Sequence, residues 1–296
     1  MTWGVSRPPI GALWGWAQVA LARNATQKLV RGTALVLSPH PDDETIGCGL
    51  LLAQMARGGH SACVALATDG GGGWYSATPR PTPDSIVQIR HGEWHRALDA
   101  LSVPKEGRFE FGFPDGTLSD HEGEVTERIG DLLRSLSPSL VLVTKPSDPH
   151  PDHRALARAT CQAVIDVYRP SHEPVSEGGR EAIGGDHANG SPPEVYSYRV
   201  YPGEGLWPDG QPPRATLVMT LLQLARSVFG LIGRRPLVLR AARSRSDKAA
   251  AIEAHKSQRK LLDGELRYVW RTGVELYWPM NERSDLTSFG LSGHLH

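Results

Sequence analysis

The sequence is poor in several features that would point to particular classes of protein. Its 32 lysines and arginines balance 32 aspartates and glutamates, so there is no net charge to attract nucleic acid. It has only three cysteines, Cys48, Cys63 and Cys161, in apolar surroundings and without the spacing of a metal site. This predicts buried, reduced thiols and agrees with a cytoplasmic location. The remaining composition, 40% hydrophobic and 22% charged over 296 residues, is typical of a soluble protein with one large α/β domain or two small ones.

Long apolar runs are also scarce, and the sequence has two of them, residues 10–22 and residues 215–233. Residues 10–22 follow Arg7 and end in an Ala-x-Ala pattern, which is typical of a signal peptide. The paired prolines before them, the internal Gln18 and the two tryptophans favour instead an amphipathic helix packed on the domain. We therefore expect residues 1–30 to form an N-terminal helical extension, with export as the alternative.

The second apolar run, residues 215–233, approaches the length of a membrane span, but it contains Arg226, Gln223 and two glycines, which argue against spanning. A buried apolar helix is one interpretation. The other is an interfacial helix that makes peripheral membrane contact through residues 215–245, which include several arginines, or binds a lipid-like substrate tail. The polar, Gly/Pro-rich residues 170–194 are expected to be a mobile insertion.

Short apolar runs alternate with helical patterns along the first half of the chain. Near-continuous apolar strands separated by helices are typical of a parallel sheet that is covered on both faces. We therefore expect an α/β fold with a Rossmann-like, mostly parallel sheet, helices on both faces and variable C-terminal elements, in a single domain over residues 31–296. The predicted strands are 33–38, 61–69, 108–113, 139–145, 195–202 and 267–278, and the predicted helices are 46–59, 86–101, 125–136, 154–168 and 248–262.

Two similar phrases, SPHPDDET at residues 38–45 and DPHPDHR at residues 148–154, each follow a predicted buried strand. The carboxyl ends of parallel strands line the ligand crevice of such a sheet. Two imidazoles and one carboxylate from this edge suit a catalytic divalent metal, which uses three protein ligands and leaves a position for water. A remaining carboxylate could act as a base and a spare histidine as an electrostatic helper. The candidate side chains are His40, Asp42, Asp43, His150 and His153.

The segments PHPDDE and HPDH resemble the two signatures of the PIG-L/LmbE-like family of zinc-dependent N-acetylglucosamine deacetylases. That family includes the deacetylases of mycothiol and bacillithiol synthesis and several antibiotic deacetylases. IRHGEWHRALDAL is similar to the family's Arg-x-x-Glu helix, with Arg90 and Glu93, and FPDG is similar to a family loop. KAAAIEAHKSQ resembles a later family helix. The matches run in the family's order over residues 33 to about 165, and a weaker resemblance continues up to residue 278.

Carried onto this sequence, the resemblance implies one zinc ion held by His40, Asp43 and His153, although Fe²⁺ or Co²⁺ would accept similar ligands. Asp42 would be the general base for attack of metal-bound water on the amide carbonyl, and later the acid that protonates the departing amine. A protonated His150 would stabilise the oxyanion that forms in the transition state.

Four further residues are expected around this centre. Arg90 and Asp115 fall where family members contact the sugar, but Arg90 could instead pair with Glu93 on a helix surface, and Asp115 could serve only its Pro-Asp-Gly turn. Asp152 is expected to orient the oxyanion-stabilising histidine. Glu44 is expected to cap or support the site from behind the metal ligands.

Other polar residues receive no role in the site. His91, His95 and His121 show no partner pattern and are expected on the surface. In the segment 248–258, helix packing and surface charge explain most positions, so we expect it to lie outside the site.

These features predict a hydrolase for carbon–nitrogen bonds other than peptide bonds. It would remove an N-acetyl or other N-acyl group from a small amino sugar or glycoconjugate, with no nucleic-acid partner. The alternatives are an amidase on a thiol conjugate or antibiotic amide, a lipid-linked amino-sugar deacetylase at a membrane surface, and a binding protein without turnover. Asp42 and His150 argue against the last, because a metal binder needs neither.

Overall fold

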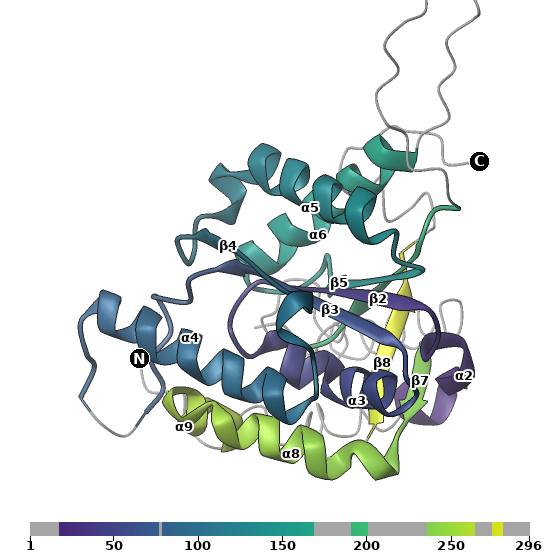
Figure 1. Cartoon of the computed structure of the whole chain (residues 1–296). Helices are drawn as coiled ribbons and strands as arrows, with labels where there is room; N and C mark the ends of the chain where they lie inside the picture. Colours follow the sequence, from purple (N-terminus) through teal and green to yellow (C-terminus); the bar gives the residue numbers. More distant parts are fainter. Residues whose placement is uncertain (1–17, 77–78, 169–190, 201–235, 264–273, 281–296) are drawn as a thin grey trace, which may run out of the picture.

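The strands form one mixed sheet around which the chain is organised (Figure 1). The computed structural model describes residues 18–76, 79–168, 191–200, 236–263 and 274–280, and within them the sheet has eight strands in the order β1-β7-β8-β6-β5-β2-β3-β4. Neighbouring strands are parallel except where β8 pairs antiparallel with β6 and β7. This confirms the predicted α/β fold. The strands are β1 (Arg23–Asn24), β2 (Thr33–Ser38), β3 (Ser61–Thr68), β4 (Arg108–Phe113), β5 (Leu140–Thr144), β6 (Glu194–Tyr198), β7 (Leu237–Arg240) and β8 (Val274–Pro279).

The larger helices lie in two layers, one on each face of the sheet (Figure 1). One layer holds α5 and α6, and the other holds α3, α4, α8 and α9. This arrangement is the one expected for parallel strands joined by helical crossovers. The helices are α2 (Thr26–Leu29), α3 (Asp43–Arg57), α4 (Pro83–Ala100), α5 (Glu122–Leu136), α6 (Pro151–Tyr168), α8 (Arg245–Ala254) and α9 (Arg259–Asp263).

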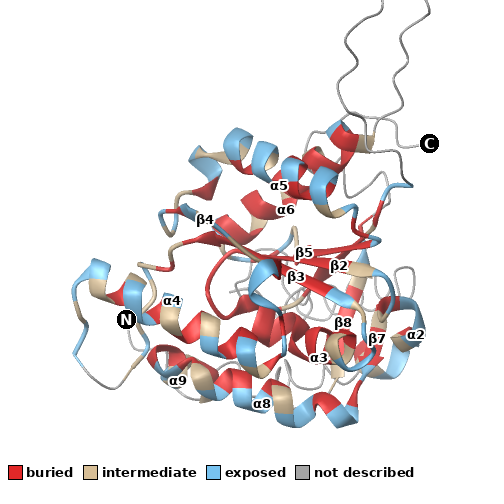
Figure 2. Cartoon of the chain, viewed as in Figure 1, coloured by how far each residue is buried: buried red, intermediate tan, exposed pale blue. Residues whose placement is uncertain are grey.

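Each face of the sheet has its own hydrophobic core, and β2 contributes to both. Because successive side chains of a strand point to opposite faces, Ala34 and Val36 join the core that contains Trp94 of α4. Leu35 and Leu37 join the core formed with α5 and α6. Figure 2 shows the central strands and the inward helix faces as buried, with exposed residues on the outer helix faces and on the edge strand β4. The turn after β2 is therefore anchored from both sides.

The helix predicted at residues 248–262 is interrupted. The α8 helix ends at Ala254, His255 has φ −82° and ψ 62°, and α9 begins only at Arg259. The backbone N–H of Ser257 donates to Glu93 Oε1 at 2.8 Å and the Ser257 hydroxyl donates to Glu93 Oε2 at 2.6 Å. A carboxylate from α4 thus replaces the local hydrogen bonds that would continue the helix.

Several predicted segments lie wholly or partly outside the described residues, namely 10–22, 215–233 and most of 170–194. Within the expected helical extension at residues 1–30, β1 pairs with β7 and so belongs to the sheet. Among the residues described, none of the helices combines the length and the apolar character needed to cross a membrane.

Candidate metal centre

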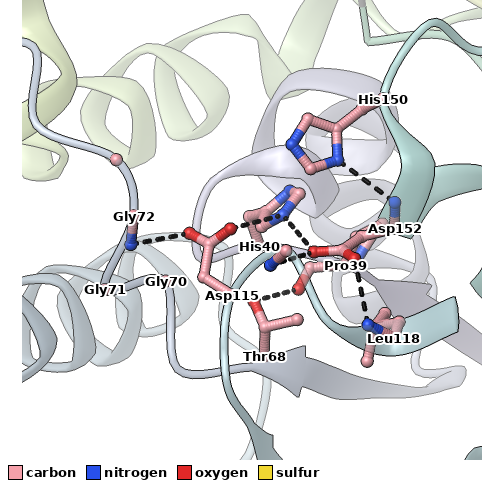
Figure 3. A network of polar contacts seen from close by, with 12 residues as sticks. Pro39, His40, Thr68, Gly70, Gly71, Gly72, Asp115, Leu118, His150 and Asp152 are labelled. Atoms are coloured by element: carbon pink, nitrogen blue, oxygen red, sulfur yellow. Dashed lines mark hydrogen bonds and ion pairs between the residues drawn. The ribbon is translucent and has the colours of Figure 1, made fainter. Parts of the chain in front are cut away.

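Two neighbouring strands bring the histidine motifs together. β2 and β5 run parallel side by side, so their carboxyl ends lie at the same edge of the sheet. The chain turns after Ser38 and enters α3 at Asp43, and it leaves β5 at Thr144 and enters α6 at Pro151. The hydroxyl and N–H of Thr68, at the end of β3, both donate to the Pro39 carbonyl, which fixes the first turn (Figure 3).

Three ligand atoms from these turns form a compact triangle. His40 Nδ1 lies 3.1 Å from Asp43 Oδ2 and 3.2 Å from His153 Nε2, and His153 Nε2 lies 3.1 Å from Asp43 Oδ2. A tetrahedral zinc ion with bonds of about 2.0–2.1 Å holds its ligand atoms about 3.3–3.4 Å apart. The three residues are at most 8% exposed, so the spacing, donor types and burial of this set fit a divalent metal.

Carboxylates behind the two histidines orient their rings. Asp148 Oδ2 lies 2.9 Å from His153 Nδ1, and Asp152 Oδ2 lies 3.2 Å from His40 Nε2. The ion pair at His153 Nδ1 and the hydrogen bond at His40 Nε2 leave the other nitrogen of each ring facing the triangle. Metal-binding histidines are commonly held in this way.

Two other groupings around His40 are less suited to a metal than the triangle. In one, ligand atoms of His40, His150 and His153 lie within 4.8 Å of one another. In the other, the same holds for His40, Asp115, His150 and Asp152. However, the Asp152 carboxylate already accepts hydrogen bonds from the N–H groups of Gly116 at 2.7 Å and Leu118 at 3.1 Å (Figure 3). The triangle with Asp43 has edges of 3.1–3.2 Å and leaves these bonds intact.

The charges of the triangle are those of a cation site. Burial lowers the pKa of His153, but Asp43 and Asp148 outweigh it and raise this pKa to about 10. Burial likewise opposes protonation of His40, yet Asp115, Asp152 and Asp43 hold its pKa well above the usual value. The two histidines therefore hold protons beside these carboxylates. A divalent ion that binds here displaces those protons.

Asp42 lies beside the triangle and is held by Arg90. Burial raises the pKa of the Asp42 carboxyl to about 7, although the Arg90 guanidinium opposes this rise. Arg90 Nη2 lies 3.3 Å from Asp42 Oδ1 and donates to the Pro41 carbonyl, while Nη1 donates to the Gly70 carbonyl at 2.8 Å. Arg90 is only 3% exposed, so it links Asp42 to the glycine-rich loop and is not a surface partner of Glu93.

His150 stands over His40, with ring centroids 4.5 Å apart. Its Nδ1 accepts the backbone N–H of Asp152 at 3.2 Å (Figure 3), so Nε2 carries the ring hydrogen. Burial, together with the charges on His40 and His153, lowers the pKa of His150. A neutral His150 can therefore still donate a hydrogen bond from Nε2. The Asp152 side chain lies against His40, and the hydrogen bond between Asp152 and His150 uses the Asp152 backbone N–H.

A cavity of about 170 Å³ opens beside these groups. Asp115 enters it from the turn after β4, with Oδ2 accepting the N–H of Gly72 at 3.0 Å. Burial raises the pKa of Asp115, but His40 and Arg90 outweigh it and lower this pKa to about 2. The lining residues are His40, Asp42, Asp43, Ile46, Gly72, Gly73, Tyr75, Arg90, Asp115, His150, Val200, Gln258 and Leu261.

Glu44 is fully buried but does not reach the triangle. Its Oε2 lies 2.9 Å from the Ser38 hydroxyl, and its Oε1 accepts the Thr45 hydroxyl at 2.7 Å. Burial raises the pKa of Glu44 to about 7. Glu44 thus connects the end of β2 to the first turn of α3, behind the ligand-bearing residues.

Two functional candidates were missed from the sequence. Asp148 opens the DPHPDHR phrase, and the only signal for it was that position. Gln258 belongs to the segment 248–258 that was expected outside the site, yet it lines the cavity and its Nε2 donates to the Gly73 carbonyl at 3.2 Å. Its signal was the resemblance of this segment to a family helix.

Residues 35–164 match the family model described as PIG-L: GlcNAc-PI de-N-acetylase. This match over less than half of the chain confirms the resemblance predicted from the two histidine motifs. Over 161 residues it is 29% identical to a 1D-myo-inositol 2-acetamido-2-deoxy-alpha-D-glucopyranoside deacetylase of Kineococcus radiotolerans, a match that covers 44% of each chain. The chain spans about half the length of the curated relatives it matches.

Solved structures share the fold. N,N'-diacetylchitobiose deacetylase from Pyrococcus horikoshii superposes with a TM-score of 0.54 at 18% identity, covering 86% of this chain and 81% of that one. The 4-carboxy-2-hydroxymuconate hydratase GalB from Pseudomonas putida gives 0.53 at 19% identity, covering 90% and 92%. Because the two neighbours carry different activities, the fold does not define the reaction.

Proposed function

We propose that the protein is a metal-dependent N-deacetylase that hydrolyses the amide of an N-acyl amino sugar or glycoconjugate. One observation carries the proposal: the triangle of His40 Nδ1, Asp43 Oδ2 and His153 Nε2 has edges of 3.1–3.2 Å. The similarity to an amino-sugar deacetylase over part of the chain supports the same reaction.

His40, Asp43 and His153 would hold the metal, and the donor set suits zinc, with Fe²⁺ or Co²⁺ as alternatives. Such an ion supplies a Lewis acid and lowers the pKa of a water from 15.7 to about 7. The carboxylates of Asp152 and Asp148 orient the rings of His40 and His153, so that a ring-nitrogen lone pair of each histidine is directed at the ion.

Asp42 acts as the general base and then as the acid. Its pKa of about 7 allows it to accept a proton from the attacking water and to return it to the departing amine near neutral pH. Arg90 holds the carboxylate in place through the 3.3 Å contact. His150 donates from Nε2 to the carbonyl oxygen as negative charge develops there, which is an interaction stronger in the transition state than in the ground state.

The cavity supports a polar, sugar-like substrate. Asp115, Arg90 and Gln258 line the cavity and offer acceptors and donors for hydroxyl groups. Ile46 and Val200 provide apolar surface that suits a small acyl group. A thiol conjugate, an antibiotic amide and a lipid-linked amino sugar would present the same acylated amine. Most of residues 215–245, the proposed membrane contact, lie outside the described residues.

The direct test is acetate release from free, nucleotide-linked, lipid-linked and antibiotic N-acetyl amino sugars, each with and without a chelator. We expect release from at least one substrate, loss with chelator and recovery with added zinc. Asp42→Asn should lower kcat by about 10²- to 10⁴-fold while the metal content stays unchanged. Asp120→Asn, at an exposed position, is the matched control. Release that persists without any metal would refute the proposal.

A further inference from the structure

A second group of metal-type ligands lies on the surface, where α4 faces β4. His91 and His95 are one helical turn apart on α4, so their side chains share one face. Glu110 projects from β4, the strand at the edge of the sheet. Glu110 is the partner that the sequence pattern around the two histidines could not reveal, because it lies on a different element.

The three side chains converge on one point. His91 Nε2 lies 2.8 Å from Glu110 Oε2 and 3.3 Å from His95 Nε2, and His95 Nε2 lies 3.3 Å from Glu110 Oε1. These spacings are close to the about 3.3–3.4 Å expected between ligands of a tetrahedral zinc ion. The side chains are 37–46% exposed, so water can complete the coordination.

A cation lies beside the cluster and opposes metal binding. Arg108 is the nearby cation, with Nη1 3.4 Å from His95 Nδ1 and 3.2 Å from the His95 carbonyl. Its Nη2 donates to Asp99 at 2.6 Å, so a carboxylate partly offsets the charge that would repel a metal ion. An open site beside a cation predicts moderate affinity.

We propose that His91, His95 and Glu110 form a second metal site that binds a divalent transition ion such as Zn²⁺ and ties α4 to β4. The bound ion clamps the helix that also carries Arg90 and Glu93. Arg90 holds Asp42, and Glu93 holds the turn at Ser257. An ion on the outer surface of α4 therefore makes the helix that supports the cavity more rigid. The proposal stands on this cluster alone and does not depend on the deacetylase assignment.

The test is zinc stoichiometry of the full-length chain, measured by elemental analysis after equilibrium dialysis against buffered Zn²⁺. We expect the double variant His91→Gln/His95→Gln to bind one ion fewer than the wild type. Asp43→Asn should lose a different ion, so combining all three substitutions removes both. His60→Gln/His121→Gln, which changes two histidines outside the cluster, should keep the wild-type stoichiometry.

A double variant that binds as much zinc as the wild type would overturn the proposal. Glu110→Gln, which keeps the side-chain shape, guards against a folding artefact: it should weaken the surface ion at least 10-fold and leave the melting temperature in chelator unchanged. If Asp43→Asn loses no zinc while His91→Gln/His95→Gln does, the surface site stands and the proposed catalytic metal fails.

Discussion

Asp148 shows how a single residue behind a ligand can define a metal centre. It is fully buried, its Oδ1 accepts the backbone N–H of His150 at 2.8 Å, and its Oδ2 lies 2.9 Å from His153 Nδ1. One carboxylate therefore positions both histidines of the second motif. Through His153 it also assigns which ring nitrogen faces Asp43.

We expect Asp148→Asn to lower zinc affinity by about 10- to 100-fold, because the amide cannot hold the ring hydrogen of His153 as a carboxylate does. The measurement is competition with a chromophoric chelator. The activity at saturating zinc should recover in large part, since Asp148 touches neither substrate nor ion. Equal affinities in Asp148→Asn and the control Asp120→Asn would contradict this role.

The motif residues were predictable from the sequence because their types and order alone suggest a ligand set. Their roles were harder to assign. The motif could not tell that the Asp152 carboxylate lies against His40 and that Asp148 supports His153, because both depend on side-chain directions in a folded turn. Arg90 is a similar case, since its contact with Asp42 joins positions 48 residues apart in the chain.

At the scale of elements, α3 is supported by a buried ion pair from two later segments. Glu275 on β8 accepts the N–H groups of Leu50 at 2.7 Å and Leu51 at 3.0 Å. Lys248 on α8 donates to the Ile46 carbonyl at 2.6 Å and to Glu275 at 2.7 Å. In a regular helix the Leu50 N–H donates to the Ile46 carbonyl. The pair thus binds one turn of the helix that begins at Asp43.

Lys248→Met should destabilise the protein by about 3–5 kcal/mol, because it leaves the 4% exposed Glu275 as a buried charge without its cation. Urea unfolding is the measurement. Lys248→Met combined with Glu275→Gln should recover part of the loss, and Lys256→Met, at an exposed position, should have little effect. A single variant as stable as the wild type would show that this pair does not support α3.

The element predictions succeeded where the pattern was local and failed where a distant contact intervenes. The helices α4 and α5 and the strands β2 to β5 follow from apolar spacing. The interruption between α8 and α9 does not, because KAAAIEAHKSQRKLL contains neither proline nor glycine. Glu93 imposes it from another helix.

At the scale of the whole molecule, stability should depend on pH through His255. This fully buried ring lies 3.3 Å from the Thr45 hydroxyl, and burial, aided by Arg90, lowers its pKa to about 3. Between pH 6.5 and 3 the unfolded chain therefore binds a proton that the folded chain does not. The free energy of unfolding falls as the pH drops through this window, by about 1.4 kcal/mol per unit.

We expect the wild type to lose about 2 kcal/mol more than His255→Gln between pH 7 and pH 5, as measured by urea unfolding at both values. The comparison of slopes removes the contribution of the other titrating groups. His60→Gln should follow the wild-type slope. Parallel curves for the wild type and His255→Gln would contradict the assignment of this pH dependence to His255.

The global architecture was predictable only in its parallel half. Buried apolar strands identified β2, β3 and β5 and therefore the edge where the motifs meet. The apolar run at 267–278 predicted β8 as a strand, but its antiparallel direction depends on its pairing with β6 and β7 and has no signal in the run itself. The two-residue β1 carries no apolar signal, because its place depends on β7, more than 200 residues later in the chain.

The position of Lys248 and Glu275 late in the chain has a consequence for biosynthesis. A ribosome releases β2 to β6 and both histidine motifs first, and the leading part of a chain begins to fold while the rest is still being made. The helix turn beside Asp43 gains its buried partners only when Glu275 has left the exit tunnel. The nascent chain can therefore gather the candidate metal ligands early, yet the helix turn beside Asp43 is completed only after Glu275 has emerged.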